Sequence, residues 1–223
     1  MKDPMQHVSK NYRQDDTNTP IDPALAAYLD EHFLRPLPYI HETNPKVLVV
    51  FSGGNAVGKT TISRKLGSEF KGLIIENDAV KRCMLEFDPT INNNQDTFNR
   101  LTWQYTINLY KHLSSKTKNG LVIRDGVIDW YFDRILPIFE KAGYRLFIIG
   151  FDISEQKARE LINKRGDTAT ADEETFYKLL DEHNIHQARF RKIYTPNIIL
   201  SDDTIFNHDL VVDKLKRFLK ITK

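Results

Sequence analysis

Cysteine is nearly absent from this sequence of 223 residues. The single cysteine, Cys83, cannot form an internal disulfide or build a cysteine-rich metal site, so we expect it to be a small apolar helix residue. No run of about 18 apolar residues is present, and the polar residues 1–7 do not resemble a signal peptide. We therefore expect a soluble, cytoplasmic protein.

A strong excess of one charge sign is missing too. Lysine and arginine together number 32, and aspartate and glutamate number 30, which gives a formal net charge of +2. Dedicated nucleic-acid-binding proteins carry a pronounced basic excess. A small anionic substrate is therefore favoured over duplex DNA, although nucleic acid bound at a local basic patch stays an open alternative.

The length suits one α/β domain with a short N-terminal extension. The first 20 residues are polar and have almost no periodic apolar positions, which predicts a tail. Asp22 and Pro23 have the residue types of a helix N-cap and of a first helical position, so they predict that a helix follows. We expect residues 1–45 to form this extension and residues 46–223 to form the main domain.

The most specific motif lies between an apolar strand and a helix. Its pattern, Gly53-x-x-x-x-Gly58-Lys59-Thr60, is that of a P-loop, in which glycines let backbone N–H groups point at phosphate oxygens. Lys59 is expected to reach the β- and γ-phosphates of ATP, and Thr60 is expected to bind Mg²⁺. The expected nucleotide-binding residues are Gly53, Gly54, Asn55, Ala56, Val57, Gly58, Lys59, Thr60 and Thr61.

Short runs of valine, isoleucine and leucine alternate with helical patterns through the main domain. Runs of this kind predict parallel strands that helices cover on both faces. The expected strands are 47–52, 73–77, 121–124, 145–152 and 197–200. The expected helices lie near 60–70, 79–86, 96–115, 130–142, 155–164, 172–190 and 208–221. The predicted fold class is α/β, a three-layer α/β/α P-loop NTPase fold with a mainly parallel five-stranded sheet and its ligand at one edge.

Two acidic residues follow predicted strands at the edge that should face this loop. Asp78 ends the second strand, and Lys81 and Arg82 come three and four positions later. A carboxylate there suits acceptance of a proton from a substrate hydroxyl while Arg82 orients the substrate, and helix capping is the alternative. Asp125 ends the third strand and is expected to bind substrate, or Mg²⁺ together with Thr60, and an Asp-Gly turn is the alternative.

The helix after the fourth strand carries arginines. Arg159 and Arg165 are expected to close over ATP and to neutralise charge on the transferred phosphoryl group, within a lid near residues 159–174. Solvated charges at a helix end are the alternative interpretation. Arg189 and Arg191 are weaker candidates for the same role.

Three further patterns are interpreted without a functional role. Asn163–Asp167 resembles a guanine-reading motif but has its aspartate one position late, which argues against a GTPase. His183 and His186 could share a helix face, but no further ligands accompany them, so we expect exposed side chains there. Asp129 and Arg134 are interpreted as a helix start and a solvated face, and acceptor binding is the alternative.

These features together resemble the small P-loop kinase group over about residues 46–202. They are the P-loop, the strand ending Asn77-Asp78 with a basic helix after it, the Leu-Val-Ile strand and the arginine-bearing lid. Within the group, the layout is similar to zeta-toxin-like and polynucleotide-kinase-like phosphotransferases of the AAA type. The resemblance implies that Lys59 and Thr60 match the ATP–Mg²⁺ site, Asp78 the catalytic base, and Arg159 or Arg165 a lid arginine.

We therefore expect an ATP-dependent kinase that transfers the γ-phosphoryl group to a hydroxyl of a small-molecule acceptor. The sequence does not name the acceptor, because Arg124–Val127 departs from the acidic-Gly-Thr pattern of zeta toxins that phosphorylate nucleotide sugars. Two alternatives stay open. One is a nucleotide-dependent ATPase or switch module, and the other is a nucleic-acid 5′-end kinase, whose affinity would depend on salt.

Overall fold

The computed structural model describes residues 20–34, 45–54, 57–116, 120–165 and 173–220. Within the described residues, the chain divides into two compact units. The smaller unit combines the described part of Met1–Pro36 with Asp78–Leu109. The larger unit combines the described parts of Leu37–Asn77 and Tyr110–Lys223.

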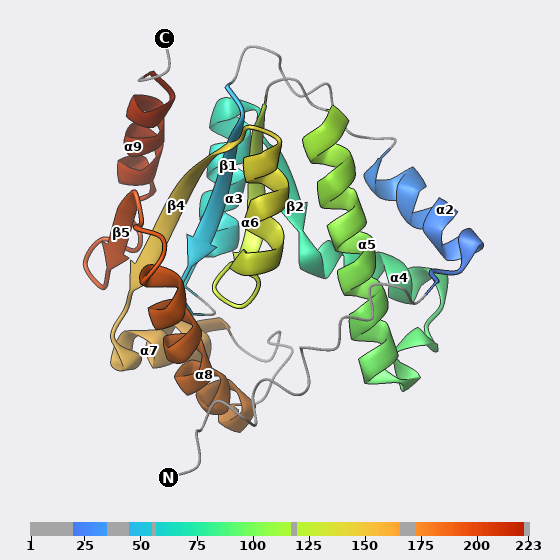
Figure 1. The fold of residues 1–223 in the computed structure, drawn as a ribbon. Coiled ribbons are helices and arrows are strands. Elements are labelled where there is room, and N and C mark those ends of the chain that lie inside the picture. Colours follow the sequence, from blue (N-terminus) through green and yellow to red (C-terminus); the bar gives the residue numbers. More distant parts are fainter. Residues whose placement is uncertain (1–19, 35–44, 55–56, 117–119, 166–172, 221–223) are drawn as a thin grey trace. The chain divides into compact units, whose positions relative to one another are not determined.

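The larger unit is built on a parallel sheet of five strands in the order β2-β3-β1-β4-β5. The strands are β1 (Val47–Ser52), β2 (Leu73–Glu76), β3 (Leu121–Val127), β4 (Arg145–Asp152) and β5 (Ile198–Ser201). All strands point the same way, so their C-terminal ends lie at one edge of the sheet, the lower edge in Figure 1. The predicted five-stranded parallel sheet is confirmed.

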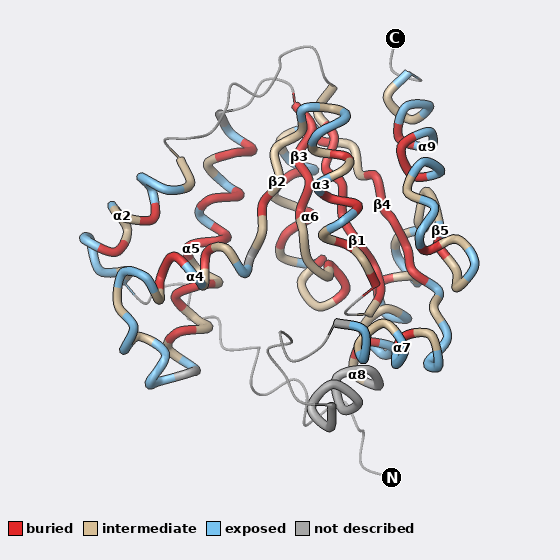
Figure 2. Tube along the Cα trace, turned by 180° about the vertical axis from the view of Figure 1, so that it is seen from behind, coloured by how far each residue is buried: buried red, intermediate tan, exposed pale blue. Residues whose placement is uncertain are grey.

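The central strand β1 is buried along its whole length. Its residues are apolar except for the last, Ser52, and Figure 2 shows the neighbouring strands β3 and β4 largely buried as well. A strand that contacts helices on both faces has no solvent face, which is why its sequence is a continuous apolar run and does not alternate. This pattern places β1, and the loop that follows it, in the middle of the larger unit.

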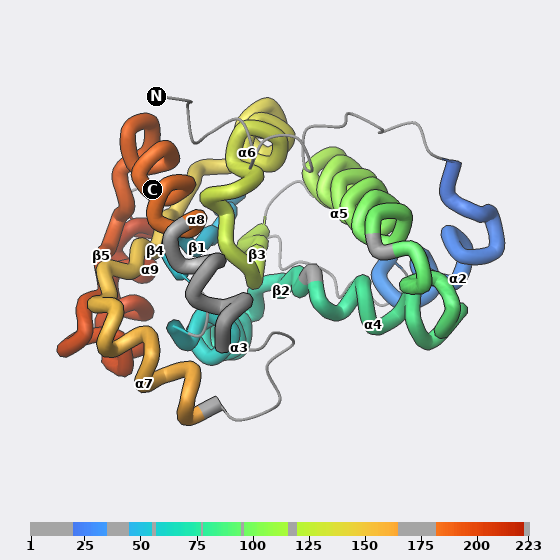
Figure 3. The backbone as a smooth tube through the Cα atoms, turned by 90° about the horizontal axis from the view of Figure 1, so that it is seen from below, coloured from blue at the N-terminus to red at the C-terminus, as the bar shows by residue number. Residues whose placement is uncertain are grey.

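Helices cover both faces of this sheet. They are α3 (Lys59–Phe70), α6 (Phe132–Lys141), α7 (Glu155–Arg165), α8 (Glu173–Arg191) and α9 (His208–Lys220). On one face, Ile62 and Leu66 of α3 pack in one core with Val211 of α9. Helix α6 lies on the opposite side of the sheet from α3, as Figure 3 shows, and Phe132 of α6 contacts Phe190 near the end of α8. The predicted three-layer α/β/α architecture is confirmed.

The smaller unit is helical. It contains α2 (Pro23–Phe33), α4 (Asn77–Phe87, from Asp78 onward), the 3₁₀ turn η1 (Ile91–Asn93) and the first part of α5 (Gln95–Lys116). The Asp22 carboxylate accepts hydrogen bonds from the N–H groups of Ala24 and Leu25, at 2.7 and 3.1 Å. The predicted N-cap at Asp22 and first helical position at Pro23 are therefore confirmed.

Aromatic contacts hold the helices of the smaller unit together. The rings of Tyr28 in α2 and Phe87 in α4 are 5.3 Å apart. The Tyr105 hydroxyl of α5 donates a hydrogen bond to Asp30 of α2, at 3.1 Å. The helix α2 thus shares its unit with Asp78–Leu109, and the boundary expected at residue 45 stays a prediction.

Among the described helices, none is both long and apolar enough to cross a membrane.

Candidate functional site

The loop between β1 and α3 ends at a glycine that starts the helix. Gly58 has a φ of +82° and occupies the N-cap position of α3, where no side chain caps the helix. Only glycine adopts this conformation without steric cost. The first N–H groups of α3 are therefore not covered by a capping side chain, and with the helix dipole they form a site for an anion. Asn55 and Ala56 lie outside the described residues.

The start of the loop also requires glycine. Gly53 has a φ of +133°, and a Cβ atom there would come within 2.8 Å of the Phe151 Cβ on β4. The same position is 3.1 Å from the side-chain amide nitrogen of Gln187 on α8. Any larger residue at Gly53 would both strain the backbone and push against β4. The two ends of the motif thus have separate structural reasons for their glycines.

Lys59 is nearly buried, with 9% of its surface exposed. Its ammonium group donates a hydrogen bond back across the loop to the carbonyl oxygen of Gly54. It also lies 5.9 Å from the centre of the Phe151 ring. A buried ammonium group costs free energy unless polar groups or counter-charges surround it. This location, inside the loop, suits the pairing with phosphate predicted from the sequence. Of the other loop residues, Thr60 is half-buried and Thr61 is exposed.

Asp125 lies beside the start of α3. Burial raises the pKa of Asp125, and a hydrogen bond from the Thr60 hydroxyl acts in the opposite direction. Glu76, its partner in the strand pairing, raises this pKa further, whereas the charge of Lys59 lowers it. A hydroxyl and a carboxylate side by side are the oxygen groups that Mg²⁺ prefers. The residues present therefore fit the predicted metal site, whose role stays a prediction.

The strands before Asp78 and Asp125 do not end at the expected residues. β3 continues to Val127, because Val127 pairs with Phe51 beyond a register shift in which β3 has the extra residues, so Asp125 lies inside the strand. β2 ends at Glu76 and α4 begins at Asn77, so Asp78 lies in the first turn of a helix. The Asp78 side chain is exposed and belongs to the smaller unit, as does the exposed Arg82. Their predicted roles in acceptor binding stay predictions.

Asp129 is fully buried, so its interpretation as a plain helix start was wrong. Its Oδ2 atom accepts a hydrogen bond from the N–H group of Gly53, at 2.7 Å. Burial raises the pKa of Asp129, against the lowering effects of Ser52 and the Gly53 N–H group. Asp129 therefore fixes the first residue of the loop. The sequence gives one sign of this contact with Gly53, which is that Asp129 is a charged residue in an otherwise apolar segment.

A histidine and a tryptophan form a second cluster beside the loop. Trp130 donates its indole N–H to Nδ1 of His183 on α8, at 2.9 Å, and its ring stacks on His186 at 4.2 Å. His183 is 6% exposed, so the expectation that its side chain is exposed was wrong. Burial, assisted by the charges of Lys59 and His186, lowers the pKa of His183 to about 4. Within the described residues, no group of three or more His, Cys, Asp or Glu side chains could hold a metal.

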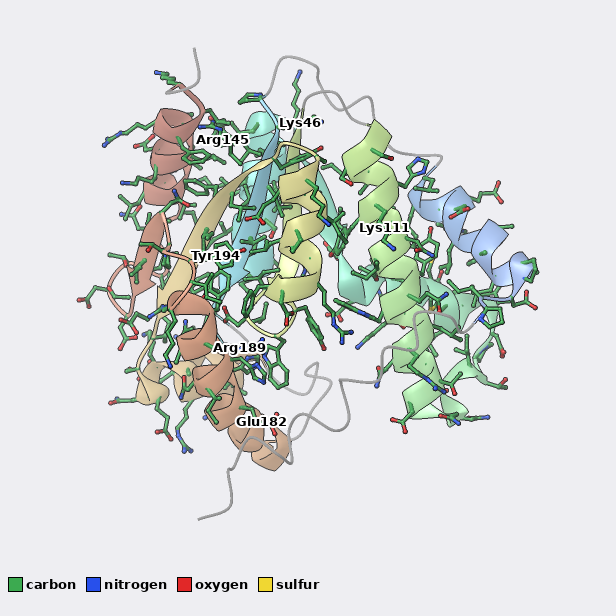
Figure 4. The ribbon with its side chains drawn as sticks, in the orientation of Figure 1. Lys46, Lys111, Arg145, Glu182, Arg189 and Tyr194 are labelled. Carbon is green, nitrogen blue, oxygen red and sulfur yellow. The ribbon has the colours of Figure 1, made fainter. Side chains whose placement is uncertain are left out.

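The arginines considered for the lid have different surroundings. Arg159 on α7 is exposed and pairs with Glu155 one turn earlier, with Nε 3.0 Å from the carboxylate. Arg189, labelled on α8 in Figure 4, pairs with Asp133 at 3.2 Å. Arg191 donates to the carbonyl oxygen of Phe151 at 3.0 Å. Arg165 is the last residue of α7, and its side chain and residues 166–172 of the predicted lid lie outside the described part.

A family model described as an AAA domain matches residues 48–184, which is more than half of the chain. The comparison with curated protein sequences found no match.

Solved structures with the same fold include three from bacteria. A candidate kinase of Chloroflexus aurantiacus is 16% identical with a TM-score of 0.59, and 81% of this chain and 100% of that chain are covered. A chain of the PezAT toxin–antitoxin system of Streptococcus pneumoniae is 17% identical, with a TM-score of 0.59 and coverage of 82% and 79%. Shikimate kinase of Acinetobacter baumannii is 16% identical, with a TM-score of 0.50 and coverage of 81% and 96%. At these identities the likeness concerns the fold.

Proposed function

The chain belongs to the AAA domain family and has the fold of small P-loop kinases, and from this premise we propose that it is an ATP-dependent kinase with a small-molecule acceptor. The transferred group is the γ-phosphoryl group, and the acceptor group is a hydroxyl. The observation that carries the proposal is the arrangement of Lys59, Thr60 and Asp125 around the loop. A cation, a hydroxyl and a carboxylate in this order suit a nucleoside triphosphate with its metal.

The proposed donor site combines Lys59 with the first N–H groups of α3, Thr60 and Asp125. Lys59 would exchange its hydrogen bond to Gly54 for a phosphate oxygen, and the open N–H groups of α3 would bind the neighbouring oxygens. Mg²⁺, when bound by Thr60 with Asp125 beside it, would neutralise charge on the phosphates. Fixed donors of this kind stabilise developing charge without reorganising during the reaction.

Acceptor activation is assigned to Asp78. Asp78 is exposed and lies in the first turn of α4. We assign it acceptance of the proton from the acceptor hydroxyl while the oxygen attacks the γ-phosphorus. Arg82 would bind the acceptor, and Arg159 or Arg165 would approach the transferred group from α7.

A small-molecule acceptor is the preferred substrate class. The formal net charge of +2 gives little support for binding a long nucleic acid. The structural neighbour from Acinetobacter baumannii was solved with shikimate, which is a small molecule with hydroxyl groups. Both observations favour a hydroxylated small molecule over a nucleic-acid end.

The test is transfer of label from γ-labelled ATP with Mg²⁺ into separate pools of nucleosides, nucleotide sugars, hydroxylated acids, aminated sugars and short RNA. We expect label in one small-molecule pool. Asp78→Asn should bind ATP as the wild type does but should transfer no label. Release of free phosphate alone, unaffected by any pool or by the substitution, would instead indicate an ATPase or switch. Label in the RNA pool would indicate a 5′-end kinase.

The matched control for Asp78 is Asp96. Asp96 is also an exposed aspartate in the first turn of a helix, α5. Asp96→Asn should therefore leave transfer unchanged, because it makes the same chemical change without a role in acceptor activation. Equal transfer by wild type and Asp78→Asn would reject Asp78 as the base.

A further inference from the structure

One face of α8 lies against the start of the phosphate loop. His183, Gln187 and Arg191 are spaced by four residues and therefore share a helix face. Gln187 and Arg191 both donate to the carbonyl oxygen of Phe151, at 2.8 and 3.0 Å, so this part of α8 is attached near the end of β4. Gln187 also lies against Gly53, the first glycine of the loop.

His183 lies one helical turn farther from the sheet than Gln187. One turn of an α-helix advances about 5.4 Å, and the N-terminal half of α8 extends beyond the C-terminal edge of the sheet (Figure 1). His183 is therefore placed beyond Gly53, on the side where phosphates would lie. The charge of Lys59 acts on the imidazole, which agrees with this placement.

The proton on the His183 ring has a defined position. Trp130 can only donate through its indole nitrogen, so Nδ1 of His183 must be the acceptor of their 2.9 Å hydrogen bond. A neutral imidazole with Nδ1 as acceptor carries its proton on Nε2. Trp130 is itself held by stacking on His186. Nε2–H is therefore the group through which His183 can donate a hydrogen bond.

We propose that His183 binds the terminal phosphate of the nucleotide through its Nε2–H group, and that Trp130 is a positioning residue that fixes this tautomer. The proposal rests on the proposed function, because it needs a nucleoside triphosphate in the loop. The loop amides enclose the inner phosphates, so a donor outside the loop meets the terminal one. A neutral donor beside Lys59 adds a hydrogen bond without adding a second buried cation, which would repel the lysine.

The competing interpretation is that the Trp130–His183 pair only attaches α8 to the β3–α6 connection. A purely structural pair would affect all nucleotides alike, or none. A contact to the terminal phosphate distinguishes a triphosphate from a diphosphate. The test therefore compares the β,γ-imido analogue of ATP with ADP, each with Mg²⁺, by isothermal titration calorimetry on the full chain.

We expect His183→Ala to weaken binding of the ATP analogue roughly tenfold to a hundredfold, which is typical for loss of a hydrogen bond to a charged group, and to leave ADP binding within about twofold. His183→Gln, which keeps an amide donor, should recover part of the loss. Asn184→Ala is the matched control, because Asn184 is exposed on the same helix. Equal weakening of both nucleotides, or no weakening of either, would overturn the proposal.

Nitrogen-15 NMR of the wild-type histidines supplies a readout that does not depend on a variant. The proposal expects a protonated Nε2 and an unprotonated Nδ1 on His183, with the Nε2 signal shifting on addition of the analogue more than on addition of ADP. The opposite tautomer would overturn it. Trp130→Phe should lose the single tautomer and weaken analogue binding less than His183→Ala does.

The same titrations separate this proposal from the proposed function. If the wild type binds both nucleotides and Lys59→Ala binds neither, the nucleotide site stands and the His183 variants alone decide the inference. If the wild type binds neither nucleotide, both the proposed function and the role of His183 are rejected.

Discussion

Asp125 and Asp129 both lie beside the phosphate loop, but they contact different parts of it. Asp125 is half-buried on the α3 side and interacts with the hydroxyl of Thr60. Asp129 is fully buried and accepts a hydrogen bond from the backbone N–H group of Gly53. Burial raises the pKa of both carboxyl groups.

The difference separates two tasks of the loop. On the α3 side, Asp125 keeps partial solvent access next to a hydroxyl, so its charge is available to a cation. On the α8 side, Asp129 and Gln187 contact backbone atoms, and His183 is neutral. We interpret the α3 side as the metal-binding side, and the α8 side as the one that fixes the loop backbone and carries the proposed phosphate contact of His183. The four predictions below test this division.

The charge of Lys59 acts on Asp125 and on His183, so we expect the loss of Lys59 to have the largest effect on transfer. Lys59→Ala should lower nucleotide-dependent transfer roughly 10³-fold, the upper range for loss of one preorganised electrostatic group. The measurement is the rate of phosphoryl transfer at saturating Mg²⁺. Lys65→Ala is the control, because Lys65 lies on the same helix but pairs with the exposed Asp209. Similar losses in the two variants would argue against a specific role for Lys59.

His183 should make the α8 side sensitive to acid. Its pKa is depressed in the folded state, from 6.5 to about 4, so its neutral form contributes stability above pH 6.5 that is lost as the pH falls toward 4. A pKa shift of this size corresponds to a loss of about 3 kcal/mol in the free energy of unfolding once the pH is well below the folded pKa. Urea unfolding at several pH values should show a smaller loss between pH 7 and 4 for His183→Gln than for the wild type. Parallel pH profiles would show that His183 is not the buried group responsible.

Asp125 should make the α3 side sensitive to metal. Asp125→Asn should lower transfer roughly tenfold to a hundredfold, the usual cost of losing a group that orients a metal ligand, and should raise the Mg²⁺ concentration needed for half-maximal rate. Titration of the rate with Mg²⁺ measures both. Asp203→Asn, at an exposed turn after β5, should change neither. An unchanged Mg²⁺ requirement would remove Asp125 from the metal site.

Substitution of Asp129 should change the stability of the fold. Its raised pKa means that the ionised carboxylate is disfavoured in the fold at pH 7 and that this cost disappears below the ordinary carboxyl pKa of about 3.9. Asp129→Asn keeps an acceptor for Gly53 and should stabilise the protein at pH 7 by no more than about 1 kcal/mol.

The matched variant Asp129→Ala leaves the Gly53 N–H group without its acceptor. It should destabilise the protein by about 1–3 kcal/mol. Urea unfolding at pH 7 and at pH 3.5 measures both variants. A destabilisation by Asp129→Asn as large as that by Asp129→Ala would show that the negative charge, and not the acceptor, holds the loop.

Local sequence patterns predicted the sheet, the loop and the first helix. The apolar run in Val47–Ser52, the glycines before Lys59 and the Asp22–Pro23 pair each act over a few residues, so their effect can be read without the rest of the chain. Strand ends were predicted less well. β3 extends to Val127 because of its pairing with Phe51, and that pairing lies outside any local window.

The side chains that complete the site are decided by tertiary structure. Tertiary structure also decides which charged side chains are buried: Arg124 is 1% exposed and donates a hydrogen bond to the carbonyl oxygen of Val127 at 2.9 Å. A polar residue in a sequence is by default interpreted as exposed, which was wrong for His183, and Asp129 was interpreted as a helix start. These residues are buried because segments distant in the chain pack around them and supply their hydrogen-bond partners.

The sequence by itself determined the α/β class and the P-loop pattern, because backbone conformation at glycines and helix starts follows local chemistry. Only the tertiary structure decided that Asp129 holds Gly53 and that Trp130 orients His183. The physical reason is that burial and hydrogen-bond partners depend on which elements meet in space, and α8 meets the loop although more than a hundred residues separate them in the chain.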